Sequence, residues 1–280
     1  MLVEMAIGDA YGAGFEYAPR DFVESRNDLS GYVRHPRHLI TPGCYTDDTQ
    51  MSLALAEAIV EGDSWTALTL ARRFVEVFRR DPRPGYARRY SDFIRSVRDE
   101  HDFLDRIKPD SEKSGAAMRA SPIGVLSDTS RVIEWATSQA CITHNTYTGI
   151  RSACAAALMT HYFLYRLGPK AELLRFLNET LPDLGLRPWA GKVREKGLMS
   201  VAAAATVVSQ HESMTRILLG SIAYTGDVDT VAAISLAAGS CSDEIDQDLP
   251  GHLQNGLENG RYGLDYLRRL DRKLLSFVHR

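Results

Sequence analysis

The sequence predicts an all-α protein. Apolar residues recur at three- and four-residue spacing along most of the 280 residues, and the strict alternation typical of strands is nearly absent. With 44% hydrophobic and 25% charged residues, the composition is that of an ordinary globular protein. No repeat of fixed period and no low-complexity linker divides the chain. We therefore expect residues 1–280 to form a single domain.

The first predicted helix covers 3–18. Its glycines, Gly8, Gly12 and Gly14, weaken a helix but allow another element to approach closely. The next stretch, 19–45, contains three prolines and has no helical period, which indicates a long loop. Long loops in compact domains are often functional, so we expect this loop to close over a bound ligand as a lid.

Most of the remaining chain has the periodicity of helices. The pattern is interrupted at 81–85 by two prolines and a glycine, and residues 113–119 are mostly small and polar. Helices are predicted over 48–62, 64–80, 87–99, 128–140, 146–167, 170–179, 191–208, 213–223, 230–240 and 252–276.

Two short acidic segments, 44–50 and 225–230, carry the strongest functional signal. Each lies directly ahead of a predicted helix. Asp and Thr at such positions are ordinary helix caps, but each segment contains more acids than a cap needs. Oxygen donors with no neighbouring His or Cys suit Mg²⁺, Mn²⁺ or Ca²⁺ rather than zinc. Four carboxylates would neutralise two divalent cations, so we expect a two-metal site formed by both ends of the chain. Its predicted ligands are Thr46, Asp47, Asp48, Asp227, Asp229 and Thr230.

The bulk properties exclude several other classes. A net charge of −3 gives no electrostatic reason to expect nucleic acid or an acidic membrane as the main partner. Four widely spaced cysteines without a C-x-x-C pair argue against a zinc ribbon and a disulfide scaffold. Residues 1–17 lack the basic start of a signal peptide, and the apolar runs are too short to span a bilayer. We expect a soluble, monomeric, cytoplasmic protein.

Taken together, these segments resemble the ADP-ribosylglycohydrolase family. The match follows the family order over nearly the whole chain, and the two acidic segments together are its specific part. The resemblance implies an orthogonal all-α bundle with two Mg²⁺ ions, or Mn²⁺, in a central cleft, held by the six residues named above. The matching segments are Ile7–Gly12 with Glu16, Tyr45–Met51, Ser114–Arg119 followed by Ser121–Gly124, Thr143-His144, Gly226–Thr230 and Leu249–Leu270.

The resemblance also implies an activity and a substrate site. Family members cleave the N- or O-glycosidic bond between ADP-ribose and an acceptor, such as a modified protein side chain, and release ADP-ribose. By position, Asp47 or Asp48 would be the general base, and Glu16 a further catalytic carboxylate facing the substrate. Substrate contacts would come from the helix start that binds the pyrophosphate and from a histidine near the ribose: Ser114, Gly115, Ala116, Met118 and His144.

Three positions depart from the family pattern. Lys113 and Ser114 stand where a glycine and an asparagine are usual, which bears on the phosphate-binding loop, and Val228 replaces a threonine between two predicted ligands. The alternatives are a catalytically inactive ADP-ribose-binding or structural member of this fold, and a two-metal phosphohydrolase. The acceptor is not identified, because its recognition would reside in the loops at 19–45 and 80–113.

Overall fold

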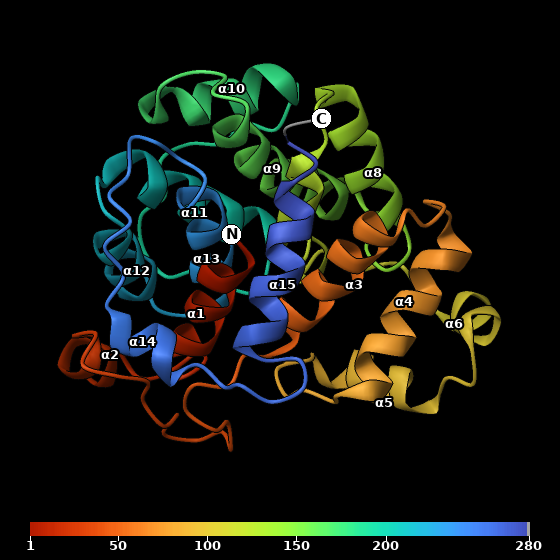
Figure 1. The fold of residues 1–280 in the computed structure, drawn as a ribbon, viewed down its shortest axis with the longest axis horizontal. Helices are drawn as coiled ribbons and strands as arrows, with labels where there is room; N and C mark the ends of the chain where they lie inside the picture. Colours follow the sequence, from red (N-terminus) through yellow and green to blue (C-terminus); the bar gives the residue numbers. More distant parts are fainter. Residues whose placement is uncertain (279–280) are drawn as a thin grey trace.

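The computed structural model describes residues 1–278 and confirms the all-α class (Figure 1). Within these residues there is no strand, only isolated β-bridges between loops. The helices are α1 (Leu2–Gly12), α2 (Arg20–Arg26), α3 (Asp47–Glu61), α4 (Ala67–Arg80), α5 (Arg88–Ser96), α6 (Glu100–Arg106), α7 (Gly115–Met118), η1 (Ser121–Val125), α8 (Thr129–Cys141), α9 (Tyr147–Leu164), η2 (Lys170–Glu172), α10 (Leu173–Thr180), α11 (Gly197–Gln210), α12 (Met214–Ala223), α13 (Val228–Gly239), α14 (Gly251–Gly256) and α15 (Leu264–Leu275).

The centre of the fold is the pair α1 and α13, which lie side by side in the middle of Figure 1. Every residue of α13 is buried, as expected of a helix that is apolar on all sides and surrounded by other helices. Its neighbours are α11 and α12 as well as α1, while α3 and α15 pack on the other side of α1. Chain ends more than two hundred residues apart therefore share one core.

Glycines set the close contact between α1 and α13. A Cβ atom on Gly8 would lie 2.5 Å from the carbonyl oxygen of Ala232, and one on Gly12 would lie 2.4 Å from the Cα of Asp229. Only glycine fits at these distances, so the predicted close approach is confirmed. The contact also places the first turn of α13, with its acidic residues, directly against α1.

Several predicted boundaries are wrong. The stretch 19–45 contains a helix, α2, which is too short to give a clear apolar period. The predicted helix 252–276 is two helices, because Gly260 and Gly263 lie in the seven-residue break between α14 and α15. Helix α6 was not expected, and α11 begins at Gly197 because the residues before it pair with neighbouring loops instead.

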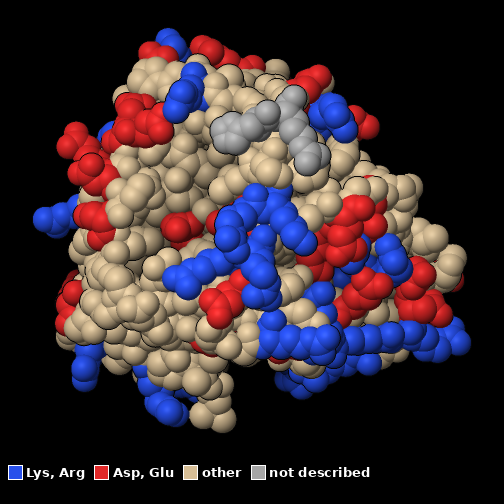
Figure 2. Space-filling model, viewed as in Figure 1, with Lys and Arg blue, Asp and Glu red and all other residues tan. Residues whose placement is uncertain are grey.

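Acidic and basic side chains are interspersed over the face seen in Figure 2, where Lys and Arg gather over α15 and along the edge below α5. Every helix in the described part of the chain is too short or too polar to cross a bilayer.

Candidate active site

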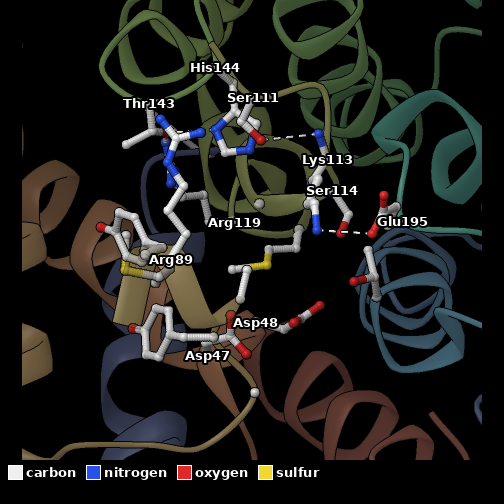
Figure 3. A pocket seen from close by; sticks show the side chains of 18 of the residues that line it. Asp47, Asp48, Arg89, Ser111, Lys113, Ser114, Arg119, Thr143, His144 and Glu195 are labelled. Atoms are coloured by element: carbon white, nitrogen blue, oxygen red, sulfur yellow. Dashed lines mark hydrogen bonds and ion pairs between the residues drawn. The ribbon is translucent and has the colours of Figure 1, made fainter. Parts of the chain in front are cut away.

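A cavity of about 1250 Å³ lies where several helices begin. The first residues of α3, α5, α7 and α13 contribute to its wall, together with the loop after α1 and the segment 106–115. Figure 3 shows Asp47 and Asp48 on one side of this cavity and Thr143, His144 and Arg119 on the other. Asp227, Asp229 and Thr230 from the second predicted acidic segment also line this cavity, so both segments reach the same space.

Asp9, a buried residue of α1, fixes the start of α3. Its carboxylate accepts hydrogen bonds from the amide and hydroxyl of Thr46 (3.0 and 2.7 Å) and from the amide and hydroxyl of Thr49 (2.9 and 2.6 Å). These bonds satisfy the free N–H groups that a capping side chain would otherwise take. The side chains of Asp47 and Asp48 are consequently not needed as caps and face the cavity.

The second acidic segment is held by a neighbouring loop. Thr225 and Gly226 have φ angles of 61° and 98°, and the amide of Asp227 donates to the carbonyl of Val193 at 3.1 Å. A Cβ on Gly226 would lie only 1.7 Å from that carbonyl oxygen, so glycine is required there. Asp227 precedes α13 without capping it through its side chain, and Ser200 donates to its carboxylate at 3.2 Å.

Glu16 joins the second acidic segment in space. One carboxylate oxygen from each of Glu16, Asp227 and Asp229 lies within 4.8 Å of the other two, so this group could hold a metal ion. Burial and the neighbouring carboxylates raise the pKa of Glu16 to about 7, and the same causes raise the pKa of Asp229 well above its ordinary value. Like charges crowded at one place without a cation are electrostatically unfavourable.

Asp48 adds direct evidence for a missing partner. Its Oδ1 atom is buried and has no hydrogen-bond partner, and burial with the charges of Asp9 and Asp47 raises the pKa of its carboxyl. A buried carboxylate oxygen without a donor is costly unless a cation or a proton satisfies it. The donor set, all oxygen, fits a hard divalent cation.

Five of the six predicted metal ligands line the cavity, and one does not. Thr46 is fully buried outside the lining, with its hydroxyl directed at Asp9. The five that face the cavity are Asp47, Asp48, Asp227, Asp229 and Thr230.

The predicted phosphate-binding segment lies beside the acidic cluster. Ser114, Gly115 and Met118 line the cavity, whereas Ala116 is buried behind them. The amide of Ser114 already donates to the carbonyl of Glu195 at 3.0 Å, so it is not free for a ligand. The amides of Gly115 and Ala116 open helix α7 and have no acceptor within it.

His144 lies against Gly115 and is neutral. A Cβ on Gly115 would be 2.9 Å from the imidazole Cε1, so the glycine makes room for the ring. Burial and the nearby Arg119 lower the pKa of His144 to about 3, and its Nδ1 is 2.7 Å from the hydroxyl of Thr143. His144 can therefore form a hydrogen bond with a ligand while its imidazole is uncharged.

Sequence reasoning missed an aromatic wall of the same cavity. Tyr86, Tyr90 and Phe93 line it, with ring centroids 5.6 and 6.2 Å apart along the series. The hydroxyl of Tyr90 is buried and has no partner. Arg119, also in the lining, is buried and bonds only uncharged groups on Gln139 and Thr143. The helical spacing of Tyr90 and Phe93 on α5 could have indicated this wall, but aromatic residues at such spacing usually pack in a hydrophobic core.

No residue of 19–45 lines this cavity, and the closure of this stretch over a bound ligand stays a prediction. The stretch instead supports the loop after α1. The imidazole of His35 bonds the carbonyl of Glu16 at 2.7 Å, and the guanidinium of Arg37 donates to the carbonyl of Tyr17. Residues within 85–93 and 106–115 line the cavity, as expected of one of the two loops assigned to acceptor recognition.

Comparison with known proteins defines the class and then the family. A solved structure described as an ADP-ribosylglycohydrolase-related protein complex has the same fold, with a TM-score of 0.76 at 19% identity over 99% of this chain and 96% of that one. The model of the ADP-ribosylglycohydrolase family matches residues 1–276. The chain therefore belongs to the ADP-ribosylglycohydrolase family and is a hydrolase acting on glycosyl bonds.

Individual relatives are distant but cover most of the chain. Human ADP-ribosylhydrolase ARH3 is 23% identical over 309 residues, which span 86% of this chain and 84% of the human protein. The ADP-ribosyl-[dinitrogen reductase] glycohydrolase of Rhodospirillum rubrum is 24% identical over 82% of this chain and 80% of its own length. The ADP-ribosylarginine hydrolase Tri1 of Pseudomonas putida is 24% identical over 76% of this chain and 58% of its own.

Proposed function

We propose that this protein is a divalent-metal-dependent ADP-ribosylhydrolase, which cleaves the glycosidic bond between ADP-ribose and an acceptor and releases ADP-ribose. The observation that carries the proposal is the convergence, in one cavity, of carboxylates whose side chains do not cap a helix. They are Glu16, Asp47, Asp48, Asp227 and Asp229. Two relatives support the same reaction class by their names: one is an ADP-ribosylarginine hydrolase, and the other is an ADP-ribosyl-[dinitrogen reductase] glycohydrolase.

Two Mg²⁺ ions, or Mn²⁺, are proposed as the cofactors. The cluster of Glu16, Asp227 and Asp229 would hold cations together with Asp48, whose unpartnered oxygen points to such a role. Asp47 and Thr230 face the same space. When bound, such ions lower the pKa of water and orient sugar hydroxyls.

The chain's own residues would bind and orient the rest of the substrate. The ribose whose bond is cleaved would lie at the carboxylates, where Asp47 or Asp48 accepts a proton from the attacking water and negative charge stabilises an oxocarbenium-like transition state. The free amides at the start of α7 suit the pyrophosphate, and the aromatic wall suits the adenine. His144, which is neutral, would hydrogen-bond the substrate between them.

A panel of ADP-ribosylated substrates tests this function. Arginine-, serine- and nucleobase-linked ADP-ribose are incubated with the protein, with Mg²⁺ or with EDTA, and products are separated by chromatography. Release of free ADP-ribose from at least one substrate, lost with EDTA, is the expected result. Release of phosphate or AMP would instead identify a phosphohydrolase, and no release from any substrate would favour an inactive binding protein.

Metal and protons are expected to compete for the acidic cluster. Because burial raises the carboxyl pKa values in the folded protein above their unfolded values, the folded metal-free protein binds more protons, and its stability falls as pH rises through the folded pKa values. A bound cation removes this loss of stability, because its positive charge offsets the repulsion between the ionised carboxylates. Mg²⁺ should therefore raise the melting temperature more at about pH 8 than at about pH 5.5, a window that brackets the pKa of about 7 for Glu16.

Differential scanning fluorimetry measures both shifts, with NaCl of equal ionic strength as the control. An equal shift at the two pH values would show that Mg²⁺ does not bind these carboxylates.

We also propose that the whole chain acts as one domain, since buried side chains from Met1 to Leu274 belong to one hydrophobic cluster. The monomeric state and the cytoplasmic location stay predictions.

A further inference from the structure

A second, smaller cavity of about 630 Å³ adjoins the candidate active site. Tyr17 lines both cavities, and Glu16, the residue before it, belongs to the acidic cluster. The two cavities therefore meet at Tyr17. The lining residues of the second cavity are Tyr17, Ala18, Pro19, Arg20, Arg37, Lys192 and Thr225.

The second cavity is basic, whereas the acidic cluster of Glu16, Asp227 and Asp229 in the first cavity is negative. Arg20, Arg37 and Lys192 line the second cavity, and no carboxylate does. Lys192 lies over the ring of Tyr17, 5.7 Å from its centroid. Arg20 pairs with Glu24 at 2.9 Å, but both side chains are largely exposed, so solvent screens that pair and Arg20 can exchange it for a ligand.

The neighbouring loop extends this basic character. Residues 29–46 contain Arg34 and Arg37 and no Asp or Glu. Lys and Arg side chains also lie on the lower left edge of Figure 2, over α2 and the loop that follows it. Leu39, two residues after Arg37, is 95% exposed.

Two residues that line the second cavity have a strained backbone conformation. Tyr17 and Thr225 have φ angles of 48° and 61°, the left-handed region that non-glycine residues rarely adopt. The strain is held in place by two hydrogen bonds, from the amide of Tyr17 to Gly226 at 2.8 Å and from the amide of Val193 to Thr225 at 3.0 Å. Such strained residues gather at ligand sites, where the surrounding structure maintains them.

We propose that the second cavity binds acidic residues that flank the modified side chain of a protein substrate. This inference rests on the proposed function. In the proposed function the reacting ribose lies at the carboxylates, the pyrophosphate at α7 and the adenine at the aromatic wall. The bond from the ribose to the acceptor then points away from the pyrophosphate, toward Glu16 and Tyr17. The polypeptide on either side of the acceptor then passes the three cations.

An acidic peptide fits this site better than a nucleic acid. Binding of a nucleic acid depends on many cations placed along its backbone, whereas the cavity offers three, and the whole chain has a net charge of −3. One or two Glu or Asp side chains match three cations within a short groove.

The test compares peptides that carry one ADP-ribosylated residue, of an acceptor type that the wild-type protein hydrolyses, flanked either by Glu or by Gln. We expect kcat/KM to be higher for the Glu-flanked peptide by on the order of tenfold at low salt, with the ratio falling as NaCl is added. Lys192→Glu should bring the ratio to one or below, and Arg20→Glu should lower it in the same direction.

Arg175→Glu is the matched control, because Arg175 is a 63% exposed residue of α10 outside both cavities, and it should keep the wild-type ratio. A ratio near one in the wild type, or one unchanged by either cavity variant, would overturn the proposal.

A binding measurement separates this proposal from the proposed function. Fluorescence anisotropy of a labelled, unmodified Glu-rich peptide needs no hydrolysis, so it reports on the cavity even if no ADP-ribosylated substrate is cleaved. Wild-type protein should bind the Glu-rich peptide more tightly than a Gln-rich one, and Lys192→Glu should remove the difference. Equal binding of both peptides, or tighter binding of a single-stranded oligonucleotide, would refute an acidic-peptide site.

Discussion

Asp48→Asn is expected to lower the rate of ADP-ribose release at least about a hundredfold while leaving the fold intact. The change keeps the size of the side chain but removes the charge of a buried carboxylate whose Oδ1 has no partner in the protein. Folding should be unaffected, because Asp9 rather than Asp48 satisfies the start of α3. Turnover at saturating Mg²⁺ and the far-ultraviolet circular dichroism spectrum measure the two effects.

Asp265→Asn is a suitable control for that variant, since Asp265 is also an acid in the first turn of a helix but lies on the exposed surface of α15. It should retain wild-type turnover. Asp47→Asn is expected to behave like Asp48→Asn. Full activity in both Asp47→Asn and Asp48→Asn would remove this pair from the mechanism.

Gly12→Ala is expected to destabilise the fold strongly. Its Cβ would lie 2.4 Å from the Cα of Asp229, a backbone atom that cannot move without separating α1 from α13. Overpacking of this kind costs roughly 1–3 kcal/mol of the free energy of unfolding, and occasionally more. The displacement would also move Asp229 away from Glu16, so metal affinity should fall together with stability.

Urea unfolding and Mg²⁺ titration of the Gly12 variant measure these two losses. Gly31→Ala is the control, because nothing lies within 4 Å of a Cβ at that position, and it should leave both quantities near the wild-type values. A Gly12→Ala protein as stable as wild type would mean that the contact between α1 and α13 is looser than described.

The parts of the site that sequence predicts are those carried by local chemistry. The two acidic segments stand out because each concentrates oxygen donors within a few residues, and both reach the cavity. The role of Asp9 could not be predicted, because it depends on contact with residues 37 and 40 positions later in the chain. Glu16 was expected at the site only from the family resemblance, and its place beside Asp227 follows from the close packing of α1 on α13.

The structure explains the three departures from the family pattern by local contacts. Lys113 forms an ion pair with Glu195 at 2.9 Å, which ties the phosphate-binding segment to the loop before α11 (Figure 3). The hydroxyl of Ser114 is one of the groups that hold down the pKa of Asp227, against the larger effect of burial. Val228 is fully buried in the core of α13 and does not line the cavity, so its methyl groups replace a threonine without removing a donor from the site.

Element boundaries were least predictable where short helices and glycines meet. The leucine spacing of α15 was read correctly, but it was extended upstream across Gly260 and Gly263 into α14. The prolines of 19–45 indicated a loop, but they gave no sign that His35 and Arg37 bond the carbonyls of Glu16 and Tyr17. Such contacts join distant residues and leave no periodic signal in the sequence.

The central claim is that the two acidic segments bind divalent cations jointly, and titration calorimetry with Mn²⁺ tests it most directly. Wild-type protein is expected to bind about two ions per chain. Asp229→Ala should lose this binding although the other acidic segment is untouched, because Asp229 and Asp48 reach the same cavity from opposite ends of the chain. Equal Mn²⁺ affinity and stoichiometry in the wild type and in Asp229→Ala would contradict a joint site.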